Sequence, residues 1–127
     1  MLRRKQRKMK DEKEEKSIWM SIKGKKVEAA KELYNLGGRT FMVLNLAPIG
    51  CYPSFLVGLP HNSSDLDRFG CMVSYNNAIV NYNNMLKESL KQTRENLSNV
   101  SVIYVDTYTV LLENFHFPAF FFSWIIF

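Results

Sequence analysis

The sequence predicts an α/β domain in which two parallel strands are joined through a long helix. Two apolar runs rich in β-forming residues, at 40–46 and 101–105, have the composition of buried strands. Between them lies the longest segment with helical periodicity, at residues 67–97. A strand, a helix and a second strand in this order form a right-handed βαβ unit, in which the two strands are parallel.

The charge of the chain is concentrated near its N-terminus. Residues 1–31 hold 12 Lys and Arg against 5 Asp and Glu, whereas residues 32–127 hold 5 against 7. Aromatic interleaving and recognised nucleic-acid motifs are absent, so we expect a solvated charged segment and no nucleic acid partner. Residues 1–26 have a helix-friendly composition with little apolar periodicity, which indicates a frayed helix or a disordered segment.

The first predicted helix covers residues 27–36, because Val27, Ala30 and Leu36 fall near one face. Gly37 and Gly38 then supply the left-handed stop that often ends a helix. The strand at 40–46 follows, and its nearly continuous apolar run predicts burial on both faces.

The loop after this strand is the first candidate for a functional site. Ligands of open α/β sheets bind beyond the carboxyl ends of the strands. Residues 47–53 are therefore a candidate pocket wall, with Pro48, Gly50 and Pro53 as its candidate residues. The alternative is a structural turn held in place by Cys51. The irregular connection continues as far as residue 66.

The long helix at 67–97 is amphipathic and can be capped at its start by Asp65 or Asp67. Its apolar positions recur at spacings of three, four or seven: Met72, Tyr75, Ile79, Tyr82, Leu86, Leu90 and Leu97. Asparagine is a poor helix former, so we expect some of its four central asparagines to bond to neighbouring loops. These four are Asn76, Asn77, Asn81 and Asn83.

The second strand at 101–105 leads into a short helix that opens at Asp106 and Thr107 and runs toward residue 114. Asp106 stands where a catalytic group or a helix N-cap would stand, and we favour the cap. Residues 119–127 carry no charge but are too few to span a bilayer, so no transmembrane segment is expected.

Cys51 and Cys71 are the two cysteines of the chain, with 19 residues between them. No CxxC pair or Cys/His cluster suggests zinc, so no metal site is predicted. In an oxidising compartment the pair could close a loop that contributes about 3 kcal/mol, whereas in the cytosol it would remain two thiols. Three N-glycosylation sequons, at Asn62, Asn96 and Asn99, favour passage of the protein through the secretory pathway.

With 127 residues and two good strands, the chain is short for a complete α/β enzyme. A two-stranded parallel unit exposes both faces and both edges of its sheet, so it is marginal in water unless something covers it. The short length and the two-stranded sheet suggest a fragment, and they give no indication of oligomeric state.

Three stretches resemble the plant-type GDSL esterase/lipases of the SGNH hydrolase superfamily. They are LYNLGGRTFMVLNLAPIGCYPSFL at 33–56, FGCMVSYNNAIVNYNN at 69–84 and VIYVDTYTVLL at 102–112. The resemblance covers residues 27–118 and implies part of a flavodoxin-like three-layer sandwich. It also implies a disulfide between Cys51 and Cys71 and a secreted, cofactor-free hydrolase of acyl or acetyl esters or lipids. Residues 1–26 and the apolar tail 119–127 fall outside it.

The resemblance does not bring the catalytic residues of the family with it. That family uses a serine in an N-terminal Gly-Asp-Ser motif, an oxyanion-hole glycine and asparagine, and a C-terminal Asp-x-x-His pair. None of these has a matching position here, so no catalytic residue is assigned. Glu113 and His116 mimic the last pair, but a contact at a helix end is expected for them. His61 is expected to be a solvent-exposed loop residue.

Two hypotheses follow from this inventory. The chain is either a piece of an ester hydrolase that is inactive as it stands, or a non-enzymatic product. The second includes a decayed copy and a fragment that binds a partner through its sheet edge and apolar tail. The family is implied to be secreted, yet residues 1–16 hold no apolar run that suits a signal peptide. Translated from Met1, the chain is therefore expected to be cytoplasmic.

Overall fold

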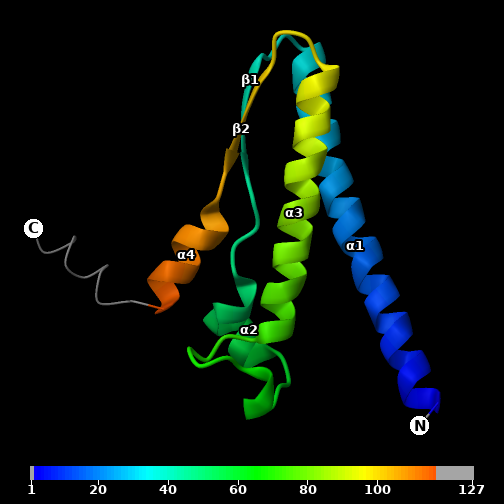
Figure 1. The fold of residues 1–127 in the computed structure, drawn as a ribbon, viewed down its shortest axis with the longest axis vertical. Helices are drawn as coiled ribbons and strands as arrows, with labels where there is room; N and C mark the ends of the chain where they lie inside the picture. The colour runs from blue at the N-terminus through cyan, green and yellow to red at the C-terminus, as the bar shows by residue number, and fades with distance from the viewer. Residues whose placement is uncertain (1, 117–127) are drawn as a thin grey trace, which may run out of the picture.

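The computed structural model describes residues 2–116 and shows a mixed α/β arrangement (Figure 1). Its helices and strands are α1 (Leu2–Asn35), β1 (Thr40–Leu44), α2 (Pro53–Gly58), α3 (Val73–Asn96), β2 (Ser101–Val105) and α4 (Thr107–His116). Two short 3₁₀ turns, Ile49–Cys51 and Ser63–Asp65, lie in the connection between β1 and α3. The predicted tail at 119–127 lies outside the described residues.

The two strands pair in parallel, as the sequence predicts, with Thr40 opposite Ser101 and Leu44 opposite Val105. The bounds of β2 agree with the prediction, whereas β1 ends two residues before residue 46. The backbone of Asn45 still bonds to β2, through an N–H that donates to the Val105 carbonyl at 3.0 Å. The next residue, Leu46, bonds to α3 instead, which takes the chain out of the sheet.

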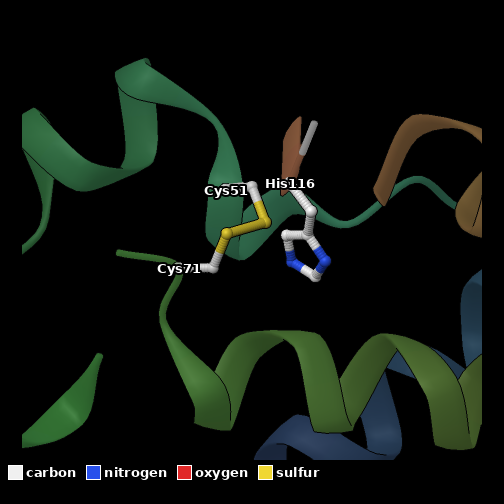
Figure 2. Close-up of side chains that lie close together, drawn as sticks. All are labelled: Cys51, Cys71 and His116. Atoms are coloured by element: carbon white, nitrogen blue, oxygen red, sulfur yellow. A yellow bond between two sulfur atoms is a disulfide. The ribbon is translucent and has the colours of Figure 1, made fainter. Parts of the chain in front are cut away.

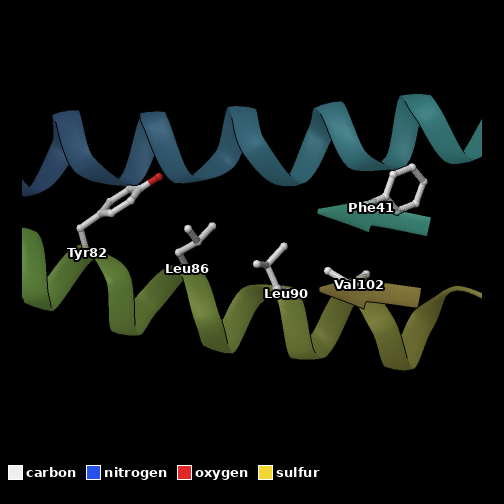
Figure 3. Close-up of a cluster of buried hydrophobic side chains, with 5 residues drawn as sticks. All are labelled: Phe41, Tyr82, Leu86, Leu90 and Val102. Carbon is white, nitrogen blue, oxygen red and sulfur yellow. The ribbon is translucent and has the colours of Figure 1, made fainter. Parts of the chain in front are cut away.

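The hydrophobic core lies where the long helix α3 packs against α1 and the sheet (Figure 3). Three residues of α3, Tyr82, Leu86 and Leu90, pack with Phe41 of β1 and Val102 of β2. Helix α1 runs beside α3 and adds partly buried apolar side chains to the same cluster (Figure 1). Both long helices therefore contribute to a single core on one face of the sheet.

The opposite face of the sheet is open, so the prediction that β1 is buried on both faces is wrong. Side chains alternate between the two faces of a strand, and Met42 and Leu44 point away from the core with 66% and 49% of their surface exposed. Ile103 of β2 is 44% exposed beside them. Within residues 2–116, the packed layer covers the other face.

Helix α1 is much longer than the predicted helix at 27–36 and includes the charged segment. Those side chains of its first 20 residues that the structure describes are exposed, and Ile22 is partly buried. The predicted stop is confirmed: Gly37 has φ of 100°, and its N–H donates to the Tyr34 carbonyl. Gly38 N–H donates to the Leu33 carbonyl, which completes a Schellman motif. A boundary at residue 26 stays a prediction.

Helix α3 begins at Val73 rather than at residue 67, and neither Asp65 nor Asp67 caps it. The Asp67 carboxylate instead accepts hydrogen bonds from the backbone N–H groups of Phe69 and Cys71, at 2.8 and 3.0 Å. Gly70, with φ of 81°, closes this turn. The turn satisfies the carboxylate locally, so the helix starts only after it.

The two shorter helices have different starts. Helix α2 lies within the predicted loop, which is a correction, and Pro53 occupies its first turn, where a missing N–H costs nothing. Helix α4 starts as predicted, because the Asp106 carboxylate accepts the Thr109 N–H at 3.1 Å. None of the helices between residues 2 and 116 combines the length and apolarity needed to cross a bilayer.

Candidate functional site

The carboxyl ends of β1 and β2 meet at one edge of the sheet, which is where α/β proteins place their ligands. Asn45 follows β1 and Asp106 follows β2, so parallel pairing brings their side chains together. The Asn45 amide nitrogen donates to the Asp106 carboxylate at 2.9 Å and to the Tyr104 hydroxyl at 3.0 Å. This edge is therefore polar and is the first place to look for chemistry.

Asn45 is buried, and its side chain is fully occupied by the protein itself. Its amide nitrogen makes the two bonds just described, and its oxygen accepts from the Thr107 hydroxyl at 2.8 Å and the Tyr108 N–H at 2.9 Å. Two donors and two acceptor positions exhaust what an amide side chain offers. Asn45 thus joins β1 to the start of α4 and keeps no group for a substrate.

Asp106 likewise has a structural role, at the start of α4. Hydrogen bonds from the side chain and the backbone of Thr109 lower the pKa of Asp106, with a smaller contribution from Asn45. A carboxylate whose pKa is lowered is a poor general base near neutral pH. The preference for an N-cap over a catalytic role, stated from the sequence, agrees with this geometry.

Two asparagines of α3 hold the loop that follows β1, as the sequence predicts for some of them. Asn83 accepts from the Leu46 N–H at 2.8 Å and donates to the Leu46 carbonyl at 2.9 Å. About two helical turns earlier, the Asn76 oxygen accepts from the Gly50 N–H at 2.9 Å. Asn77 and Asn81 lie on the exposed side of α3.

The three candidate pocket-wall residues lie in different environments. Pro48 and Gly50 are buried, and Gly50 packs so closely on α3 that a Cβ there would collide with the Met72 carbonyl. Pro53 is exposed at the start of α2. The structure thus uses Pro48 and Gly50 for packing, and a role in a pocket wall stays a prediction.

Cys51 and Cys71 form a disulfide with an S–S distance of 2.10 Å and a Cα–Cα distance of 4.3 Å (Figure 2). His116, at the end of α4, lies against it, and one of its ring nitrogens and the two sulfur atoms are all within 4.8 Å of one another. The His116 ring stacks on Phe69 with ring centroids 3.7 Å apart. Residues from three separate segments therefore meet around the disulfide.

Neither histidine has the surroundings of a catalytic base. His61 is half-buried rather than solvent-exposed, which is a correction, and its Nδ1 lies 2.9 Å from the Leu59 carbonyl oxygen. His116 stacks on Phe69, so the expected contact with Glu113, which is exposed, is replaced by a contact with the loop before α3. In the part of the chain that the structure describes, no serine hydroxyl bonds to either histidine.

The three glycosylation candidates are all exposed. Asn62 precedes the second 3₁₀ turn, where its backbone N–H donates to the Asp65 carboxylate at 2.7 Å. Asn96 is the last residue of α3, and Asn99 has φ of 52° in the turn that leads to β2. The geometry leaves each side-chain amide at the surface.

Asn45 is the residue at this edge that the sequence pattern did not single out as functional. The available signal was a polar residue directly after an apolar strand, in the position that Asp106 occupies after the second strand. Pairing the two positions required the register of the strands, which the sequence pattern does not provide.

Comparison with known proteins gives a consistent result. The profile of the GDSL-like Lipase/Acylhydrolase family matches residues 8–124. A GDSL esterase/lipase of Arabidopsis thaliana is 52% identical over 88 residues, which are 69% of this chain and 23% of the relative. The GDSL esterase/lipase ENOD8 of Medicago truncatula is 41% identical over 65% of this chain and 21% of its own length.

A third relative carries a different name. The Arabidopsis thaliana protein named Alpha-L-fucosidase 3 is 35% identical over 70% of this chain and 24% of its own length. The chain thus spans about a quarter of the length of these relatives. No solved structure matches the chain significantly.

Proposed function

The chain belongs to the GDSL-like Lipase/Acylhydrolase family, and we propose that it is a scaffold segment of an enzyme that hydrolyses carboxylic esters. The substrates proposed are acyl or acetyl esters or lipids. The observation that carries the proposal is the family match over a segment whose strands, helix and asparagine-held loop together form one edge of an α/β sheet.

The segment supports the reaction without performing it. Acyl transfer by a serine hydrolase needs the nucleophile, its base and the oxyanion donors in one place, because all act on the same transition state. The 127 residues contain no Gly-Asp-Ser. At the sheet edge, the Asn45 side chain makes its four hydrogen bonds within the protein, and the Asp106 carboxylate accepts bonds from Asn45 and Thr109. The segment therefore positions the sheet edge next to which catalytic groups from other segments would lie.

The open face of the sheet supports the same role. A three-layer sandwich has helices on both faces of its sheet, and here the face with Met42, Leu44 and Ile103 is uncovered within the described residues. Apolar side chains on such a face are typical of a surface that another layer covers. In the complete domain, the remaining layer would pack there.

A chimera tests the proposal. The matching 88-residue stretch of the Arabidopsis relative that is 52% identical is replaced by the corresponding residues of this chain. We expect the secreted chimera to hydrolyse a short-chain aryl ester, and we expect Gly50→Val in the chimera to reduce the yield of active enzyme. A chimera that folds, as judged by circular dichroism, but has no esterase activity would contradict the proposal.

The isolated 127-residue chain provides the second measurement. It should hydrolyse the same ester no faster than buffer, because the nucleophile and its partners are absent from it. Turnover that is clearly above buffer and is abolished by His116→Ala would show that the histidine beside the disulfide is catalytic.

A glycoside is the second substrate class, because one relative is named an alpha-L-fucosidase. The chimera is therefore also assayed on an aryl α-L-fucoside with the aryl ester as the reference. Activity on the fucoside alone would replace the ester proposal.

Partner binding by the isolated chain is the alternative function, and the open sheet face favours it. If that function holds, the chain binds a second protein without any need for the rest of a hydrolase domain. The isolated chain is tested for self-association by sedimentation and for binding of other proteins by capture from a cell extract. If it is monomeric and binds no protein, while the chimera is active, the alternative is contradicted.

The compartment that suits the proposal is an oxidising one, reached through the secretory pathway. The disulfide and the three exposed sequons support it. Produced behind a secretion signal in a plant or yeast cell, the chain should gain mass that an endoglycosidase removes. Asn62→Gln is expected to remove one glycan, because Asn62 lies in an exposed loop, and three sequon variants that leave the mass unchanged would contradict glycosylation.

A further inference from the structure

We propose that reduction of the Cys51–Cys71 disulfide creates a binding site for a divalent cation of borderline softness, with Zn²⁺ as the cation of choice. The ligands are the two thiolates and the imidazole of His116. In the oxidised protein, one ring nitrogen of His116 and both sulfur atoms already lie within 4.8 Å of one another (Figure 2). Two cysteines and one histidine are a ligand set that Zn²⁺ uses, with a fourth position left for water.

The loops that hold the cysteines are fixed by bonds other than the disulfide. The Met72 N–H, next to Cys71, donates to the carbonyl of Gly50, next to Cys51, at 2.9 Å. The Gly50 N–H in turn donates to the buried Asn76 side chain at 2.9 Å. These bonds remain after reduction, so the two thiols stay opposite each other. Tetrahedral bonds of about 2.3 Å place two thiolates about 3.8 Å apart, which rotation of the cysteine side chains allows.

A hydrogen-bond donor already faces the Cys51 sulfur. The Asn76 amide nitrogen lies 3.5 Å from this sulfur and donates to it. Such donors to the ligands are a regular part of metal sites and fix their orientation. Asn76 therefore has one bond that holds the loop and one that supports the proposed ligand.

His116 has a ring nitrogen available for coordination. Its Nε2 is buried from solvent and has no hydrogen-bond partner among residues 2–116, although a buried imidazole nitrogen ordinarily has one. The stack on Phe69 fixes the plane of the ring beside the sulfur atoms. A neutral imidazole keeps its proton on one nitrogen and uses the lone pair of the other for the metal.

The reaction that opens the site is a thiol–disulfide exchange with a dithiol reductant. The reductant gives two electrons and two protons, becomes a cyclic disulfide and leaves Cys51 and Cys71 as thiols. Binding of the cation then releases the two thiol protons to solvent. Two thiolates neutralise the charge of a divalent cation, which suits cysteines whose exposure is only 5% and 3%.

The test uses Co²⁺, which reports thiolate ligands and tetrahedral geometry through its visible absorption. The full chain is titrated in its oxidised form and after reduction with excess dithiol that is removed anaerobically. We expect one Co²⁺ per reduced chain, displacement by one Zn²⁺, and no thiolate-to-cobalt absorption for the oxidised chain. Far-UV circular dichroism is recorded at each step to follow the helices.

Two histidine variants make the test specific. His116→Ala should weaken Co²⁺ binding by the reduced chain at least about tenfold, since removing a ligand costs more than removing its supporting group. His61→Ala is the matched control and should leave the affinity unchanged, because His61 bonds to the Leu59 carbonyl instead. Cys51→Ser should remove part of the thiolate-to-cobalt absorption even if a weaker complex still forms.

Three results would overturn the proposal. The first is equal affinity in the His116→Ala variant and the parent chain, and the second is a reduced, helical chain that binds no Co²⁺. The third is a reduced chain that loses its helical signal and does not regain it when Zn²⁺ is added. In that case the loops do not hold the site together without the disulfide.

Discussion

At the scale of single residues, Gly50 decides how closely the loop after β1 approaches α3. A Cβ added at Gly50 would collide with the Met72 carbonyl oxygen and would lie 2.7 Å from the Asn76 side-chain oxygen. The close approach lets Gly50 bond with both the backbone and a side chain of the α3 region. The absence of a side chain at Gly50 therefore lets the segment with Cys51 lie close to the segment with Cys71.

Replacement of Gly50 by alanine is therefore expected to destabilise the protein. Overpacking of this kind costs roughly 1–3 kcal/mol, because backbone has to move to admit the methyl group. Gly58→Ala is the control, since nothing lies within 4 Å of the Cβ position there, and its effect should be within about 0.5 kcal/mol. Urea unfolding of the oxidised proteins measures both, and equal stabilities for the two variants would contradict the packing argument.

Asn45→Ala should cost more than a surface asparagine because four hydrogen bonds end on its side chain. At about 0.5–1.5 kcal/mol each, with partners that regain water in part, a loss of roughly 2–4 kcal/mol is expected. Asn77→Ala, on the exposed side of α3, should change the free energy of unfolding by less than about 0.5 kcal/mol. The same urea experiments compare the two, and an Asn45 variant as stable as the Asn77 variant would exclude the bonding network as a source of stability.

At the scale of elements, the start of α4 makes stability depend on pH. Hydrogen bonds from Thr109 lower the pKa of Asp106 in the folded chain, so the unfolded chain takes up a proton at a higher pH than the folded one. The stabilisation is present above the pKa of an unfolded aspartate, about 4. It is lost as the pH falls through the lower pKa of the folded state.

Asp106→Asn removes this charge while keeping a side chain that can cap. The variant should be less stable than the parent chain at pH 7, and the difference should shrink as the pH falls below about 4. Thermal unfolding at a series of pH values gives the difference directly. A difference that stays constant down to pH 2.5 would mean that the Asp106 carboxylate does not titrate differently in the folded chain.

The sequence predicted the elements whose local pattern and tertiary role agree. β2 and the parallel pairing follow from an apolar β-branched run and from the strand–helix–strand order. The start of α3 could not be predicted in this way, because an aspartate carboxylate can accept bonds either from the first N–H groups of a helix or from the N–H groups of a turn. The bond between Gly50 and Met72, which are far apart in the sequence, favours the turn.

In the candidate site, too, the features set by local sequence could be predicted and those set by distant contacts could not. Local rules predicted the Asp106 cap and the bonding of helix asparagines to loops. The asparagine hub at Asn45 and the meeting of His116 with the disulfide needed contacts between segments about 60 and 45 residues apart, which no local pattern encodes.

At the scale of the whole molecule, one face of the sheet carries the core and the other carries exposed apolar side chains. A lone two-stranded sheet with such a face is marginal in water. If the chain is a scaffold segment, another layer of the complete domain covers this apolar face. One substitution on this face should then have different effects in the isolated chain and in the complete domain.

Met42→Lys should change the stability of the isolated chain by less than about 0.5 kcal/mol, because the side chain is 66% exposed. In the chimeric hydrolase, the same lysine would be buried without a partner and should cost several kcal/mol, seen as a large loss of soluble, active enzyme. Asn81→Lys, at an exposed polar position of α3, is the control and should be tolerated in both contexts. If Met42→Lys is equally harmless in the chimera, this face stays open to water in the complete domain, and its apolar side chains need a separate partner.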